Sequence, residues 1–174
     1  TDTVLLDDHS NAVAHNGKRY ATAIAPGNHA FAALFHDAGL QHDIGKDHAK
    51  WQIAKGNRDD SIRIAKPIIE NPGKVGGYRH EWGSLWKIKD APGCDLVRHL
   101  VATHHGWFRP SMPDKGFDSP PEPSRQNPTR LEAVFRYSEL QAQLGYWRLA
   151  YLEALLKTSD AVASRDALSC EDEQ

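Results

Sequence analysis

The stretch "HDIGK", residues 42–46, decides how the fold is read, because it puts a histidine and an aspartate where an apolar helix face should continue. Residues 29–43 repeat apolar side chains at steps of three and four, including Leu34 and Ala38, and this spacing predicts an amphipathic helix. The same steps lead on to His42 and Asp43. We therefore expect both side chains to point into the core.

Three other predicted helices extend their apolar faces into polar side chains. These are His9 in residues 4–24, His104 and His105 in residues 95–105, and Asp160 in residues 146–164. A single histidine on an apolar face is most often a hydrogen-bonded core residue. Burying several such groups costs free energy unless they share a partner. Imidazole and carboxylate without thiolate favour a first-row divalent metal as that partner.

Length, charge and cysteine content limit the class of protein that this chain can be. A chain of 174 residues that is 40% hydrophobic predicts one domain over residues 1–174. The net charge of −2 does not favour a protein that simply coats DNA. Cys94 and Cys170 lie far apart, which excludes a thiolate zinc site and suggests a reducing compartment, the cytoplasm. No apolar run approaches the ~20 residues that span a bilayer. Because the chain begins with Thr1, we expect a piece of a longer polypeptide.

The fold class expected from the pattern is all-α, since period-two alternation is almost absent. Helices are predicted over residues 4–24, 29–43, 82–89, 95–105, 130–143 and 146–164. Residues 109–128 hold six of the ten prolines, which predicts a long surface loop or flap. Residues 167–174 are expected to form a frayed tail.

Four motifs together resemble the HD phosphohydrolase superfamily: "HDIGK" at 42–46, "RHE" at 79–81, "THHG" at 103–106 and "SDAVAS" at 159–164. More narrowly, His9 with "HDIGKDHAKWQ", "YRHEWGS", "VATHHGWFRP" and "EALLKTSDAVAS" is similar in order and spacing to the HD nuclease domain of the type I CRISPR nuclease-helicase. The resemblance implies a compact helical HD-domain bundle.

The resemblance also implies a dinuclear metal site in which Asp43 bridges two ions. One ion would take His9, His42, Asp43 and Asp160, and the other Asp43, His80, His104 and His105. The expected ions are divalent transition metals, Mn, Fe, Co or Ni, with Zn or Mg as alternatives. Lys46 would stabilise transition-state charge; the alternative is a solvated lysine at a helix end.

The activity that the resemblance implies is metal-dependent hydrolysis of single-stranded DNA, with RNA as a further expected substrate. Arg79, Ser84, Arg109 and Ser164 are candidate substrate contacts. The expected partners are a helicase domain, in the same or a separate polypeptide, and a CRISPR RNA-guided surveillance complex, with no membrane. His15, His29, His48 and His99 are expected outside the site.

Two alternatives stay open. One is another HD phosphohydrolase, either a nucleotidase or a cyclic-dinucleotide phosphodiesterase. The G-Y-P signature of the latter is absent after the paired histidines, where the sequence reads "HHGWFRPSMPDKGF". The other is a non-catalytic module that binds metal or nucleotide to regulate or dock a partner.

Overall fold

A computed structural model describes residues 3–69, 73, 75–88, 94–106, 109 and 123–169. Within these residues the chain forms α-helices and one 3-10 helix, and no strand beyond a single Leu5–Ile64 bridge, so the all-α prediction is confirmed. The elements are α1 (Leu6–Ile24), α2 (His29–Gln41), η1 (Ile44–Lys46), α3 (Ala49–Ala54), α4 (His80–Ile88), α5 (Asp95–Thr103), α6 (Pro123–Leu144) and α7 (Tyr146–Ser169).

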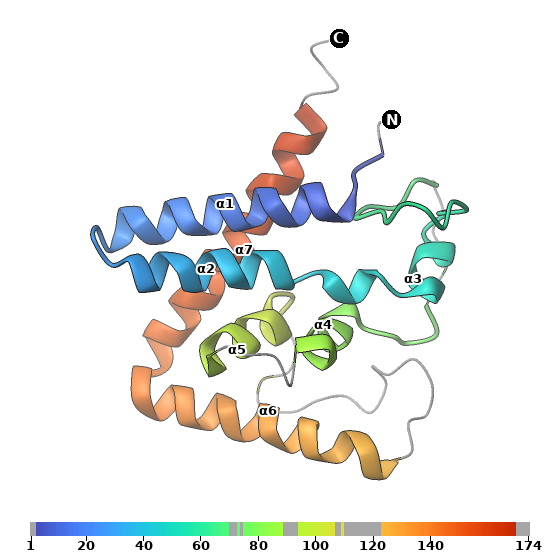
Figure 1. Ribbon diagram of the computed structural model, residues 1–174. Helices are drawn as coiled ribbons and strands as arrows, with labels where there is room; N and C mark the ends of the chain where they lie inside the picture. Colours follow the sequence, from blue (N-terminus) through green and yellow to red (C-terminus); the bar gives the residue numbers. More distant parts are fainter. Residues whose placement is uncertain are drawn as a thin grey trace.

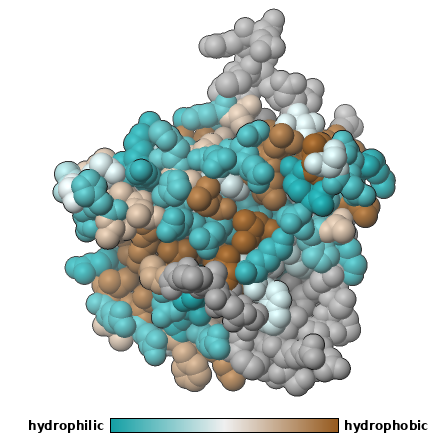
Figure 2. Space-filling view, in the orientation of Figure 1, coloured by the Kyte–Doolittle hydropathy of each residue, from teal (hydrophilic) through white to brown (hydrophobic). Residues whose placement is uncertain are grey.

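The helices surround a shared apolar core. Helices α1 and α2 lie side by side and antiparallel, α7 crosses them, and α4 and α5 lie between α2 and α6 (Figure 1). Five of these helices each contribute a fully buried side chain, namely Val13, Phe35, Leu85, Leu100 and Leu156. Figure 2 shows hydrophobic residues gathered near the middle of one face, with hydrophilic residues around them. Burial of each such side chain stabilises the fold by roughly 1.5–3 kcal/mol.

Glycine lets α1 and α2 approach backbone to backbone. A Cβ added at Gly39 would lie 2.5 Å from Ala14 Cα, so no larger residue fits at this crossing. Since the two helices run antiparallel, the beginning of α1 lies beside the end of α2 (Figure 1). His9 is thereby brought next to His42, with 5.5 Å between their ring centroids.

The start of α2 is held by a side-chain cap. Asn28 Oδ1 accepts a hydrogen bond from the Phe31 N–H at 3.0 Å. We expect Asn28→Ala to lower the free energy of unfolding by about 1 kcal/mol, because one N–H of the first turn loses its partner. Urea denaturation measures this change, with Asn11→Ala at an exposed position of α1 as the control. Equal stability of the two variants would contradict the capping role.

Several predicted boundaries are corrected. Helices α2 and α5 end at Gln41 and Thr103, two residues before the predicted ends, and the short helix α3 was not predicted. Helix α6 begins at Pro123, inside the predicted loop, because proline suits the first helical position, where its missing N–H has no intrahelical partner. Helix α7 continues to Ser169, so the first residues of the predicted tail are helical.

Two expectations fall largely outside the described residues. These are the remainder of the Pro-rich loop, at positions 110–122, and the last five residues of the tail. Among the described helices, none combines the length and apolar character that crossing a membrane requires.

Candidate metal centre

Seven histidine and aspartate side chains from distant parts of the sequence meet at one end of α2. They form two groups: His9, His42 and Asp160; and Asp43, His80, His104 and His105. Within each group, one potential ligand atom per residue lies within 4.8 Å of every other. The structure therefore brings together all seven residues that the sequence indicated as metal ligands.

Asp43 lies between the two groups. Its Oδ2 is 3.2 Å from His42 Nε2 and 3.4 Å from His9 Nε2. Its Oδ1 is 3.2 Å from His80 Nε2 and 3.6 Å from His104 Nε2. Each carboxylate oxygen thus faces one group of imidazoles, which is the arrangement that a bridging carboxylate requires.

The remaining donors complete each group. Asp160 Oδ1 lies 3.1 Å from His9 Nε2 and 3.9 Å from His42 Nε2. His105 Nε2 lies 3.0 Å from His80 Nε2. Donor atoms that share one ion at about 2.0–2.2 Å are separated from one another by about 3–3.5 Å. The spacing of these donors therefore fits a metal ion in each group.

The ends of two helices orient two of the imidazoles. His42 Nδ1 donates to Gly39 O at 2.7 Å, and His104 Nδ1 donates to Val101 O at 2.7 Å. Both carbonyls belong to a last helical turn, where no intrahelical N–H is available to them. Because a carbonyl engages Nδ1 in each ring, Nε2 is the ring nitrogen that is left to face the centre.

Several of the inward atoms lack a hydrogen-bond partner. Among the described residues, His9 Nε2, His42 Nε2, His104 Nε2 and Asp43 Oδ1 are buried and unpartnered. Leaving such a group unsatisfied costs roughly 1–3 kcal/mol. One divalent cation in each group would satisfy these atoms, so the residues fit a metal at both places.

The two carboxylates are kept ionised. Burial opposes ionisation of Asp43, but His42 and Lys46 outweigh it and hold the pKa of this carboxyl well below its usual range. Burial also opposes ionisation of Asp160, but His9 and His42 lower its pKa. Both side chains therefore carry a negative charge at neutral pH, as metal ligands must.

The imidazoles of the centre differ in the direction in which their pKa values are shifted. Partial burial, together with the neighbouring His104 and His80, lowers the pKa of His105 to about 4. Burial likewise lowers the pKa of His80. His9 is the exception: burial would lower its pKa, but Asp160 and Asp43 raise it. At neutral pH, His80 and His105 are therefore neutral rings that can offer a lone pair.

Lys46 is buried against the centre. Its Nζ lies 2.5 Å from Asp43 Oδ2 and donates to Ala65 O at 3.2 Å, and the residue is 7% exposed. The contact forms because residues three apart eclipse one another in a 3-10 helix such as η1. The alternative of a solvated lysine at a helix end is therefore wrong.

Ser84 supports the segment of residues 42–46 from α4. Its Oγ accepts a hydrogen bond from the Gly45 N–H at 2.9 Å, and the side chain is fully buried. The expectation that Ser84 touches substrate is therefore wrong, because no surface of it is open to a ligand.

Removal of this hydroxyl should loosen the segment. We expect Ser84→Ala to lower the free energy of unfolding by about 1–3 kcal/mol, because the buried Gly45 N–H loses its acceptor. Chemical denaturation tests this, with Ser138→Ala as control, since the Ser138 hydroxyl bonds Val134 O on the exposed side of α6. A Ser84→Ala variant as stable as that control would contradict the supporting role.

The other candidate substrate residues have different surroundings. Arg79 Nη2 donates to Glu81 Oε1 at 3.0 Å and lines an open cleft of about 700 Å³ beside His80 and His105. Arg109 is already paired with Glu153, so its charge is compensated within the protein. Ser164 lies next to Asp160, with 3.3 Å between Ser164 Oγ and Asp160 Oδ1.

The structural roles of Gln52 and Lys66 could not be predicted from the sequence. Gln52 positions the backbone beside the centre, and Lys66 places a charge near Asp160 through Ser164. The Gln52 side chain donates to Lys46 O and Ile64 O and accepts from the Ile64 N–H and from Asn57 Nδ2, at 2.8–3.0 Å. All its bonding positions are therefore used to fasten η1 to Ile64 and Asn57. Gln52 ends the stretch "HDIGKDHAKWQ" that resembles the family, but no role was predicted for it, and Lys66 lies in none of the quoted motifs.

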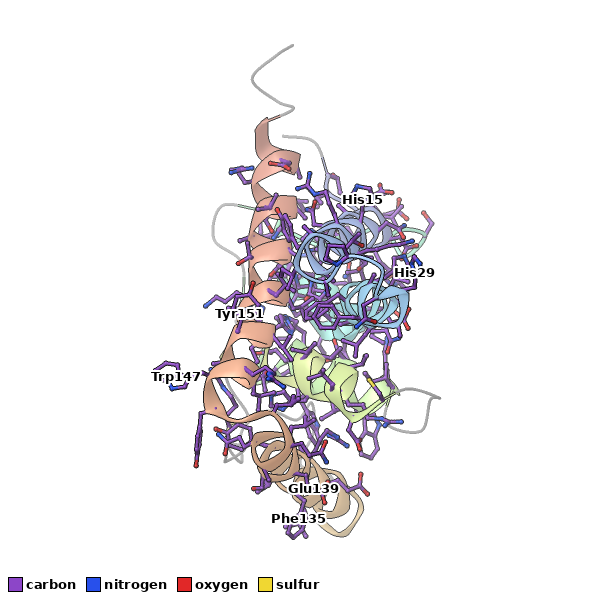
Figure 3. All side chains as sticks on the ribbon, turned by 90° about the vertical axis from the view of Figure 1, so that its left-hand side faces the viewer. His15, His29, Phe135, Glu139, Trp147 and Tyr151 are labelled. Carbon is purple, nitrogen blue, oxygen red and sulfur yellow. The ribbon has the colours of Figure 1, made fainter. Side chains whose placement is uncertain are left out.

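The histidines that were expected outside the centre lie outside it. His15 and His29 are exposed on α1 and α2 (Figure 3). His48 accepts a hydrogen bond from the Lys50 N–H in the cap of α3. His99 is buried, with its Nε2 2.6 Å from Glu153 Oε1.

Comparison with known proteins gives one match. The family model described as HD domain matches residues 6–142. No curated protein and no solved structure matches the chain. The matched range includes six of the seven clustered donors, and Asp160 on α7 lies beyond it.

Proposed function

Because this chain belongs to the HD domain family, whose members are generally metal-dependent hydrolases, we propose that it is a nuclease that cleaves single-stranded DNA at two divalent transition-metal ions. The expected ions are Mn, Fe, Co or Ni. In this proposal residues 1–174 form a single HD nuclease domain.

The observation that carries the proposal is the position of Asp43. One of its oxygens faces His9 and His42, and the other faces His80 and His104. Divalent ions held by these two groups would supply polarisation of a phosphodiester and a lowered pKa for a water molecule that attacks at neutral pH. The carboxylates of Asp43 and Asp160 supply the negative charge that holds such ions.

Lys46 would act through Asp43. Its ammonium lies against Oδ2, so it fixes the orientation of the carboxylate and adds a positive charge beside the reacting phosphate. The contact to Ala65 O holds this lysine in place. Lys46 therefore supports both the ligand geometry and the developing negative charge.

The cleft beside the centre favours a polymeric substrate. Its volume is about 700 Å³, and it is open to solvent. Trp51, Lys55, Tyr78 and Arg79 line it next to the donors His80 and His105. Trp51 is itself buried, so the groups that a strand could reach here are the half-buried Tyr78 ring and the cationic side chain of Lys55. An aromatic ring beside a cation is typical of sites that hold a single strand through its bases and phosphates. A nucleotidase would instead enclose one small molecule.

The proposed setting follows from the sequence resemblance. We place the chain in the cytoplasm, as the degradation arm of type I CRISPR interference. It would act with a helicase domain in the same or a separate polypeptide and with an RNA-guided surveillance complex. RNA is a further candidate substrate.

A circular single-stranded DNA tests the activity directly, because a circle has no ends for an exonuclease. We expect Mn, Co or Ni to support cutting and a chelator to abolish it. His29→Ala, at an exposed histidine of α2, is the matched control and should cut as the wild type does. Intact circles with hydrolysis of mononucleotides or cyclic dinucleotides would replace the nuclease with another phosphohydrolase. Metal binding without any hydrolysis would indicate a regulatory module.

A further inference from the structure

Lys66 is held at the edge of the metal centre by the segment before it. Gln52 fastens Ile64 through both its N–H and its carbonyl. The next residue, Ala65, donates to Val4 O at 2.8 Å and accepts from Lys46 Nζ. Ile64 and Ala65 are almost completely buried. The backbone just before Lys66 is therefore anchored to Val4 at the entry to α1, to η1 and to α3.

The ammonium of Lys66 points to α7. Its Nζ donates to Ser164 Oγ at 2.7 Å, and Ser164 Oγ in turn donates to Asp160 Oδ1 at 3.3 Å. Within the part of the chain that the structure describes, no carboxylate oxygen lies within 4.0 Å of this nitrogen. A neutral hydroxyl thus lies between the positive charge and Asp160, and two hydrogen bonds separate the ammonium from the carboxylate.

This surrounding is unlike that of other lysines that stabilise the fold. Lys87 Nζ pairs with Asp47 Oδ2 at 3.0 Å, and Lys46 pairs with Asp43. Lys66 is half-buried, and burial together with the charge on Lys46 lowers its pKa. A cation in such a place lacks a directly bonded anion, and a bound anionic ligand would supply one.

We propose that Lys66 binds a phosphate oxygen of the nucleic acid strand on the Asp160 side of the centre, with Ser164 orienting its ammonium. The inference rests on the proposed nuclease function and deepens it. Lys55 lies in the cleft on the opposite side, next to His80 and His105, whereas Arg79 in the same cleft is paired with Glu81. Cationic side chains would then contact the strand on both sides of the scissile phosphate.

Binding without cleavage tests this role. The probe is a fluorescently labelled 12-nucleotide single strand, measured by anisotropy with the full chain in EDTA over a series of salt concentrations. For Lys66→Gln we expect affinity to fall about tenfold. The slope of log affinity against log salt should become shallower by about 0.7, the value for one lost phosphate contact on a single strand.

Three comparisons separate this role from a structural one. Lys66→Arg should keep the wild-type slope, because the charge remains. Lys18→Gln removes an exposed lysine of α1 and should also leave the slope unchanged. The number of Mn ions bound per chain should be the same in Lys66→Gln as in the wild type.

An unchanged salt slope in Lys66→Gln, or a loss of bound Mn, would overturn the inference. This binding measurement does not depend on whether the protein cuts DNA. Suppose that the wild-type protein binds the strand with a salt slope that depends on Lys66, but leaves DNA circles intact. This result would contradict the proposed nuclease activity and support the Lys66 contact. A wild type that cuts circles while Lys66→Gln keeps the full slope would contradict the Lys66 contact alone.

Discussion

Replacement of Asp43 by asparagine is expected to lower the turnover of single-stranded DNA by roughly a thousandfold or more, which corresponds to about 4 kcal/mol of lost transition-state stabilisation. An amide offers one neutral oxygen in place of two anionic ones, so at most one group of imidazoles keeps an oxygen ligand at this position and the bridge between the groups is lost. The buried ammonium of Lys46 also loses its ion-pair partner. Metal content per chain, measured by mass spectrometry after dialysis, should fall with the turnover.

The chain contains a matched control for this variant. His36 and Asp37 form a second His-Asp dipeptide on α2, with 3.5 Å between His36 Nδ1 and Asp37 Oδ1. The Asp37 side chain is 56% exposed, and it takes no part in the metal centre. Asp37→Asn should therefore keep wild-type metal content and turnover. Full activity in Asp43→Asn with two ions bound would contradict the bridging role.

Replacement of Gly45 by alanine is expected to destabilise the fold by about 3 kcal/mol and to displace α4 from η1. A Cβ at this position would lie 2.0 Å from His80 O and 2.6 Å from Ser84 N. Both are backbone atoms, so no side-chain rotation can relieve the overlap. Because His80 is a donor of the centre, the loss of stability should be accompanied by weaker metal binding.

Gly73→Ala is the control for Gly45→Ala. The nearest atom to a Cβ at Gly73 is Ala54 O at 3.4 Å, an ordinary contact. Its free energy of unfolding should stay within about 0.5 kcal/mol of the wild-type value. Urea denaturation and Mn titration of both variants give the comparison. A Gly45→Ala variant as stable as Gly73→Ala would show that the close approach of α4 is not required.

The convergence of the donors could be predicted because burial of ionisable groups carries a physical cost that few partners can offset. His42, His104 and Asp160 each follow an apolar helix face, and chemistry rather than spacing alone indicated a shared cation. The sequence did not reveal how His42 and His104 are oriented. That orientation depends on α2 and α5 ending one residue before them, so that a free carbonyl accepts each Nδ1–H.

The roles of Ser84 and Lys66 were not predicted correctly, because both depend on contacts between segments that are distant in sequence. Ser84 was expected to touch substrate, but it packs on Gly45, 39 residues away. Lys66 carried no motif, and its place depends on Gln52 and on Ser164, which lies 98 residues away. Local pattern fixes which face of a helix is buried, whereas these pairings form only when helices pack.

The most direct test of the account is anomalous diffraction from crystals of the chain grown with Mn²⁺. The account predicts two anomalous peaks about 4 Å apart, with Asp43 between them. One peak should lie among His9, His42 and Asp160, and the other among His80, His104 and His105. Mn²⁺ found only at other sites, with these seven side chains bonded to one another instead, would contradict it.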